Sequence, residues 1–136
     1  MKLFVFVIMP NHIHFIAQFS DMNPLSDVMR DFKKFTARQI YHVFQAEENT
    51  KMIDFVQKEG EAVKQEYKIW EDGYDARDVY SREFLQQKMD YIHHNPCRPQ
   101  WKLVETPEEY PWSTASFYFA EQPCVIPIDD VRGFFI

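Results

Sequence analysis

The chain has few of the residues that define several classes of small protein. It holds 2 cysteines and 3 glycines among its 136 residues. Cys97 and Cys124 are too few for a disulfide scaffold and lack the C-x-x-C spacing of a zinc or redox site, so we expect a reduced cytoplasmic setting. The scarcity of glycine excludes collagen-like and low-complexity chains.

Long hydrophobic runs are also missing. The most apolar N-terminal run, Leu3–Met9, is far shorter than a membrane span and has no small-residue cleavage site behind it. We therefore expect neither a signal peptide nor association with a membrane.

Positive charge is in deficit, because 15 basic residues stand against 21 acidic ones and give a net charge of −6. This balance argues against a polycation that coats duplex DNA, although it leaves room for a local basic patch. Apolar residues make up 46% of the chain and aromatic residues 17%, enough for a sizeable core. We expect one domain over residues 1–136, with its core in residues 3–118 and a C-terminal extension over 119–136.

The N-terminal third predicts a hairpin followed by a long helix. Leu3–Met9 is a run of strand-forming residues, and after Pro10-Asn11 a second strand-like run covers residues 12–19. From Pro24 to about Gln45 apolar residues recur at three- and four-residue steps, as in an amphipathic helix.

The rest of the chain predicts smaller elements. Residues 47–66 are charged and weakly patterned, which indicates a solvated helix or loop. A short strand is expected at Tyr67–Trp70 and a turn at Asp72-Gly73. A helix is expected from the N-cap Ser81 to Asn95, because the residue before Pro96 is pushed out of the helical region. Loops and one or two short helices are expected over residues 97–136.

Two histidines stand at alternate positions of the second strand. His12 and His14 should project from one face of it, whereas Ile13 points to the other, so the two imidazoles could clamp a metal ion. Taken alone, this pattern also fits two ordinary surface or packing histidines.

The helix over residues 81–95 carries a second candidate set. Its core stripe is Leu85, Met89 and Ile92, and Tyr91 faces away from the centre of that stripe. The neighbours of Tyr91 on its own face are Gln87 and Lys88 one turn before, and His94 and Asn95 one turn after. A half-buried tyrosine at a helix boundary is the structural alternative.

Phosphoryl transfer to a tyrosine needs such a set of side chains. A phenol is a weak nucleophile at neutral pH and needs a proton acceptor or a nearby cation, and a scissile phosphate needs a divalent ion. Two histidines and one amide oxygen leave positions open for phosphate oxygens and water. Mg²⁺ or Mn²⁺ would fit, although ligand softness alone ranks Zn²⁺ or another transition ion as a better match to imidazole.

The long helix carries a candidate track for phosphates. Arg30, Lys34 and Arg38 recur at four-residue steps with Lys33 beside them. Asp27 and Asp31 lie within reach, so a mixed-charge solvated face is the alternative. Aromatic side chains near Trp70, Tyr74 and Tyr80 could stack on unpaired bases, or belong to the core.

Four segments together resemble one protein family. The segments VIMPNHIHFIAQ, FKKFTARQI, IWEDGYDARDVYSREFLQQKMDYIHHNP and ETPEEYPWSTASFY are similar, in order and spacing, to the REP-associated tyrosine transposases. These are single-tyrosine HUH transposases, related to the transposases of the smallest bacterial insertion sequences. The resemblance covers roughly residues 4–118, and the pairing of MPNHIH with YIHHNP is its most specific part.

The resemblance implies a metal-dependent enzyme that cleaves and rejoins single-stranded DNA beside hairpins formed by REP-like palindromes. It implies that His12 and His14 bind a divalent metal and that Asn95 completes the metal site. Tyr91 would be the nucleophile that forms a 5′-phosphotyrosine link and frees a 3′-hydroxyl. Candidate DNA-binding residues are Arg30, Lys33, Lys34, Arg38, Lys88 and His94.

The resemblance also implies an α+β fold, with a ferredoxin-like antiparallel sheet and helices on one face. Family members usually carry a strand and a helix before the histidine hairpin, and this chain is expected to lack both. The chain would then be a truncated copy, or a member that completes the sheet by forming a homodimer. A catalytically decayed protein that only binds hairpin DNA is the main alternative, and a small metal-dependent phosphohydrolase is a third.

Overall fold

A computed structural model of the chain describes residues 1–134 and shows an α+β protein. Its described elements are β1 (Lys2–Ile8), β2 (Ile13–Gln18), α1 (Leu25–Ala46), α2 (Thr50–Glu61), α3 (Arg82–His94) and α4 (Ala115–Ala120), with short 3₁₀ turns η1 (Asn95–Cys97) and η2 (Pro107–Glu109). The described chain divides into two compact units, residues 1–20 with 77–136 and residues 21–76. Residues 135–136 of the expected C-terminal extension lie outside the described residues.

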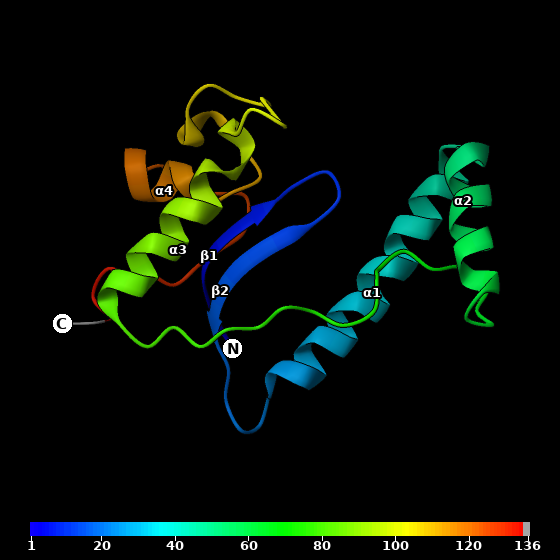
Figure 1. The fold of residues 1–136 in the computed structure, drawn as a ribbon, viewed down its shortest axis with the longest axis horizontal. Helices are drawn as coiled ribbons and strands as arrows, with labels where there is room; N and C mark the ends of the chain where they lie inside the picture. Colours follow the sequence, from blue (N-terminus) through cyan, green and yellow to red (C-terminus); the bar gives the residue numbers. More distant parts are fainter. Residues whose placement is uncertain (135–136) are drawn as a thin grey trace. The chain divides into compact units, whose positions relative to one another are not determined.

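The first unit is built on the expected hairpin (Figure 1). β1 and β2 pair antiparallel, with Ile8 opposite Ile13 and Val7 opposite His14. The backbone N–H of Met9 donates to the carbonyl oxygen of His12 at 2.8 Å and closes the connection between the strands. The α+β class is therefore confirmed. The ferredoxin-like arrangement has only loose support, because the described sheet has two strands.

β1 is covered on both of its faces. Residues 4–7 are all buried, although successive side chains of a strand point to opposite faces. One face meets α3, whose Leu85, Met89 and Ile92 are buried in the same core, as the helical spacing predicted (Figure 1). A continuous apolar run in the sequence thus corresponds to a strand enclosed on two sides.

The edge of β1 that faces away from β2 is also covered. Residues 112–114 run beside it, with the N–H of Ile8 donating to the carbonyl of Trp112 at 2.8 Å and the N–H of Thr114 donating to the carbonyl of Phe6 at 3.0 Å. Three further carbonyl groups of β1 also accept hydrogen bonds. The hydroxyl of Tyr110 donates to the carbonyl of Ile8 at 2.6 Å, and the hydroxyl of Tyr118 donates to that of Phe4 at 2.8 Å. The N–H of Asp129 donates to the carbonyl of Leu3 at 2.8 Å. An unsatisfied edge at this position is therefore avoided without another strand.

The core of this unit extends beyond the expected limit of residue 118. Val131 is buried with Phe4 and the α3 stripe, and its N–H donates to the hydroxyl of Tyr118 at 3.2 Å. Val131 therefore belongs to the core of this unit, although it lies in the segment expected as an extension.

α3 begins and ends close to the predicted residues. The hydroxyl of Ser81 accepts from the N–H of Phe84 at 3.1 Å, which confirms the predicted N-cap. The predicted reason for its end was wrong, because Asn95 keeps helical angles of φ −53° and ψ −46° before Pro96. The helical path continues through η1 and ends at Arg98, where ψ becomes 150°. Proline disfavours a helical predecessor, but the tighter 3₁₀ turn accommodates one here.

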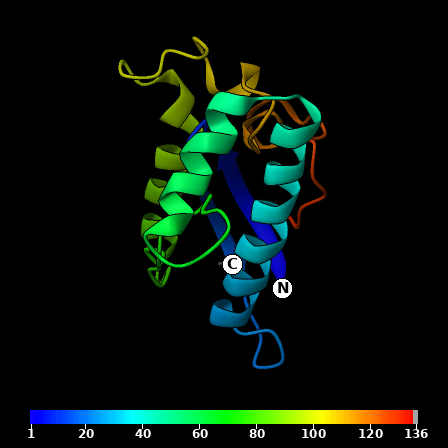
Figure 2. The same ribbon diagram turned by 90° about the vertical axis from the view of Figure 1, so that its right-hand side faces the viewer.

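The second unit contains α1 and α2, which run side by side in both views (Figure 1 and Figure 2). α1 matches the helix predicted from Pro24 to Gln45, and α2 lies within the segment left open as a helix or loop. Tyr41 is buried in α1, and its hydroxyl accepts from Nε2 of Gln57 in α2 at 2.8 Å.

The short strand predicted at Tyr67–Trp70 was wrong. The segment has no regular secondary structure and pairs with no strand among the described residues. Its polar and aromatic groups pack on helices instead: the ring of Tyr67 stacks on Tyr41 with centroids 4.0 Å apart, and Nε1 of Trp70 donates to Oγ1 of Thr36 at 2.8 Å. Gly73 follows with φ +73°, a left-handed conformation suited to the predicted turn.

Candidate active site

The two alternate histidines lie on one face of the hairpin, as their spacing predicted. The rings of His12 and His14 meet edge to face with centroids 5.0 Å apart. His12 ends the turn between the strands and His14 pairs opposite Val7, so both are fixed by the register of the hairpin. Two imidazoles are therefore available side by side, both of them only partly exposed.

His12 is held in a defined orientation. Its Nδ1 donates to Oδ1 of Asn11 at 2.6 Å, which leaves Nε2 as the ring nitrogen free to bind a metal. Partial burial lowers the pKa of His12, because it disfavours the charged imidazolium. A neutral imidazole is the form that binds metal ions.

Tyr91 lies on α3 directly against this pair. Its side chain is 41% exposed, as predicted for a residue facing away from the core stripe. The ring of His14 meets the ring of Tyr91 edge to face, with centroids 5.4 Å apart. The structure thus brings together the strand histidines and the helix tyrosine, which are far apart in the sequence.

Two cations flank the ring of Tyr91. The guanidinium carbon of Arg98 lies 4.1 Å from the ring centroid, and Nζ of Lys88 lies 5.7 Å from it. Lys88 was predicted as a neighbour from its position one turn before Tyr91. A phenol between an imidazole pair and two positive charges is placed where a phosphodiester would be attracted.

Asn95 is buried one turn after Tyr91, at the start of η1. Its amide oxygen is the predicted third donor, and two imidazoles with one amide suit a divalent ion that keeps positions open for other ligands. Within residues 1–134 no group of three or more His, Cys, Asp or Glu side chains is arranged to hold a metal ion. A metal at this site would therefore depend on the two histidines and the amide.

The basic residues of α1 belong to the other compact unit. Arg30 pairs with Asp27 at 3.0 Å and with Asp31 at 2.9 Å, which matches the mixed-charge alternative for this residue. The Nζ of Lys33 donates to the carbonyl oxygens of Glu71 and Gly73, so it holds the chain after Trp70.

Lys34 and Arg38 are the exposed remainder of the stripe on α1. Neither forms an ion pair with another residue in the part of the chain that the structure describes. His94, the other predicted DNA contact, is exposed on α3, and its Nδ1 bonds to the carbonyl of Asp90 at 2.9 Å.

Two residues of the site were missed from the sequence. Arg98 lies two helical turns after Tyr91. This spacing places it on the same helix face only if the helix continues, and the helix was expected to stop at Asn95. Since η1 continues the helical path, the side chain of Arg98 returns over Tyr91. The ring of Trp101 lies 5.7 Å from that of His12, and no pattern in the sequence connects these two residues.

Comparisons with protein-family models, curated proteins and solved structures find no match to this chain. No described helix combines the length and the apolar character needed to cross a bilayer.

Proposed function

We propose that the chain is a metal-dependent enzyme that cleaves and rejoins single-stranded DNA beside hairpins, with Tyr91 as the nucleophile. The observation that carries this proposal is the direct contact of Tyr91 with His14, whose ring in turn meets His12. The resemblance to REP-associated tyrosine transposases, drawn from the same residues, supports it. That resemblance supplies the class of substrate.

In this proposal His12, His14 and Asn95 would hold a divalent ion, Mg²⁺ or Mn²⁺. Asn11 orients His12, whose pKa partial burial lowers in favour of the neutral, metal-binding form, and His14 lies beside it. Asn95, one turn after Tyr91, carries the amide oxygen. An ion held by these donors would neutralise and orient the scissile phosphate. The remaining steps belong to the side chains of the chain itself.

Tyr91 carries out the covalent step. Its phenolic oxygen attacks the phosphorus and loses its proton to solvent, while the bond from phosphorus to the 3′ oxygen breaks. The 3′ oxygen takes up a proton and leaves as a 3′-hydroxyl, and the 5′ phosphate stays on Tyr91. Attack by a 3′-hydroxyl on this phosphotyrosine reverses the step and rejoins a strand, so no other reactant is required.

Arg98 and Lys88 have supporting roles in this proposal. The guanidinium of Arg98 lies 4.1 Å from the ring centroid of Tyr91, where it fixes the direction of the phenol. Both cations also attract the anionic phosphodiester to the site. The ring remains open enough for a phosphate to approach, because Tyr91 is only partly covered.

A covalent trapping assay tests the proposal. Labelled single-stranded hairpin DNA is incubated with the full chain and Mg²⁺ or Mn²⁺, and a protein–DNA adduct that survives denaturation is sought. We expect an adduct with the unmodified chain and none with Tyr91→Phe, which keeps the ring and removes the hydroxyl.

The control is Tyr74→Phe, at a partly exposed tyrosine in the other compact unit. It should form the adduct as the unmodified chain does. An adduct formed by Tyr91→Phe would refute the assignment of the nucleophile. Binding of hairpin DNA with no adduct under any metal would favour the decayed DNA-binding protein instead.

A further inference from the structure

Aromatic and cationic side chains continue along α3 from Tyr91 toward its N-terminal end. Tyr80, just before the N-cap, is 77% exposed. Its ring stacks on that of Phe84, with centroids 4.9 Å apart and planes 15° from parallel. An exposed ring stacked on a second ring leaves its outer face available to a further flat group.

Lys88 joins this stack to Tyr91. Its Nζ lies 5.2 Å from the ring centroid of Phe84 and 5.7 Å from that of Tyr91. Because Phe84, Lys88 and Tyr91 stand four and three residues apart, they share one face of α3. We name Tyr80, Phe84, Lys88 and Tyr91 the α3 ladder. It extends for about three helical turns, roughly 16 Å.

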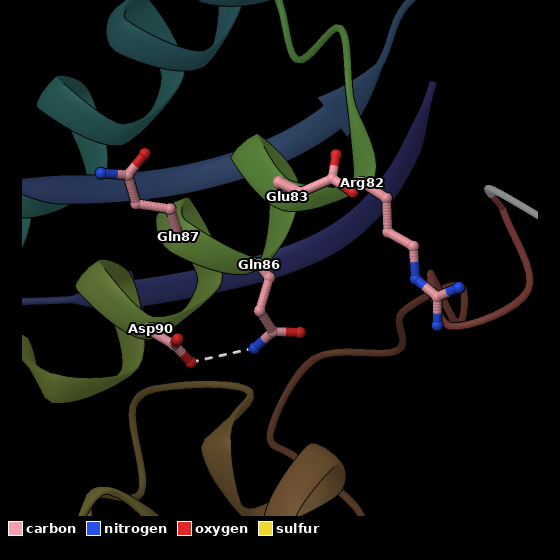
Figure 3. Close-up of a pocket in the computed structure, with 5 residues that line it drawn as sticks. All are labelled: Arg82, Glu83, Gln86, Gln87 and Asp90. Atoms are coloured by element: carbon pink, nitrogen blue, oxygen red, sulfur yellow. Dashed lines mark hydrogen bonds between the residues drawn. The ribbon is translucent and has the colours of Figure 1, made fainter.

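The ladder is distinct from both other faces of α3. The core stripe with Leu85 and Met89 is about 100° away around the helix. The neighbouring exposed face has a shallow hollow of mixed charge, in which Gln86 donates to Asp90 at 3.0 Å (Figure 3). Figure 3 shows Arg82 extending away from this pair, so that face presents no convergent group.

We propose that the α3 ladder binds the unpaired DNA that adjoins the scissile phosphate. A base would stack on the open face of Tyr80, extending the stack with Phe84, and Lys88 would pair with a phosphate of the same strand. This inference rests on the proposed function, because Tyr91 forms the end of the ladder nearest the histidines.

The alternation of rings and cations is the reason to choose single-stranded nucleic acid. Unpaired bases gain stacking energy on aromatic side chains with little regard to sequence, while their phosphates need positive charges at intervals. In a duplex the bases are already stacked on one another, so a ring such as Tyr80 would add little stacking energy. The net charge of −6 makes this local arrangement more significant, since no general positive field attracts DNA.

Fluorescence titration with a short oligothymidylate that carries one 2-aminopurine tests the ladder. EDTA is present, so binding is measured without any cleavage. We expect Tyr80→Leu to bind roughly 5- to 140-fold more weakly, the equivalent of about 1–3 kcal/mol for one stacked base. Tyr80→Trp keeps an aromatic ring and should restore both binding and quenching of the 2-aminopurine.

Two further variants complete the test. Gln86→Ala changes an exposed residue on the neighbouring face and should bind as the unmodified chain does. Lys88→Gln should reduce the slope of log affinity against log salt by about 0.7, the value for one phosphate contact on a single strand.

Unchanged affinity of Tyr80→Leu would overturn the ladder, and so would equally tight binding of a duplex of the same length. These results are independent of the covalent assay. If the unmodified chain forms the Tyr91 adduct and Tyr80→Leu binds DNA with unchanged affinity, the role of the ladder is disproved but the proposed chemistry is not. A chain that binds through Tyr80 without forming an adduct disproves the proposed chemistry alone.

Discussion

His14 and Tyr91 meet edge to face with their ring centroids 5.4 Å apart, although one is on β2 and the other on α3. Their contact depends on the packing of α3 against β1, since β1 sets the register of His14 and buries the opposite side of the helix. The candidate site is thus positioned by the core of the first unit.

Loss of a histidine should weaken binding of a divalent ion. His14→Ala removes one donor, and Asn11→Ala removes the group that orients His12. We expect each to lower Mn²⁺ affinity by about 10- to 100-fold or more, with Asn11→Ala at the lower end. Calorimetric titration of each variant with Mn²⁺, without DNA, measures this affinity.

The matched control for that titration is His42→Ala, at an exposed histidine of α1 in the other unit. Its Mn²⁺ affinity should equal that of the unmodified chain. Equal affinity for His14→Ala would remove the strand histidines from the metal site.

Replacement of Arg98 should slow the covalent step. Arg98→Ala removes the guanidinium stacked on Tyr91, and we expect the rate at saturating DNA to fall by about 2- to 30-fold, the range of a cation–π contact. Arg98→Lys should restore little, because an ammonium does not stack as a planar guanidinium does. Single-turnover adduct formation gives the rate, and an unchanged rate in Arg98→Ala would exclude the positioning role.

Stability should fall in acid because of His93. This side chain is 1% exposed, and burial is the main cause that lowers its pKa to about 4, with His94 adding repulsion and Asp90 opposing it. Above about pH 6.5 the residue is neutral in both folded and unfolded chains. Below about pH 6.5, His93 becomes protonated in the unfolded chain but stays neutral in the folded chain. Up to about 3 kcal/mol of the unfolding free energy is therefore lost toward pH 4.

Urea denaturation at a series of pH values checks this behaviour. His93→Gln has no group to titrate, so its free energy of unfolding should change less between pH 7.5 and pH 5. His42→Gln, at the exposed position, should retain the full change. Identical slopes for His93→Gln and the unmodified chain would assign the acid sensitivity to other groups.

Thr114 should be among the polar residues most costly to replace. Its buried Oγ1 accepts from the N–H of Phe6 at 3.1 Å and shares a hydrogen bond of 2.8 Å with Nε2 of His93. Thr114→Val keeps a side chain of similar volume but leaves the N–H of Phe6 and Nε2 of His93 without a hydrogen-bond partner. We expect the unfolding free energy to fall by about 2–5 kcal/mol. Thr114→Ser keeps the hydroxyl and should lose much less, as thermal or urea unfolding would show.

Local sequence pattern was sufficient to predict the elements whose structure depends mainly on their own residues. The apolar run before Pro10, the period of α1 and the cap at Ser81 each predicted their element to within one or two residues. The alternation of His12 and His14 likewise predicted a shared face, because a strand allows no other arrangement.

Prediction failed where distant segments decide. Residues 67–70 have strand-like side chains, but α1 offers them aromatic and hydrogen-bonding partners, and α2 accepts from the N–H of Lys68. Within residues 1–134 they therefore join no sheet. The covered edge of β1 needs Tyr110 and Tyr118, whose roles no local period reveals. Arg98 was missed for a different reason: a general rule about proline ended the helix one turn too early.

The covered edge of β1 also sets the order in which the protein can fold during synthesis. β1 is synthesised well before Thr114, Tyr118 and Asp129, which satisfy its carbonyls. All of residues 21–76 must be synthesised in between, so the loop to be closed is long and the first unit is expected to fold slowly. Until then an apolar strand stands with one edge unpaired, and the newly made chain is most prone to aggregate in that interval.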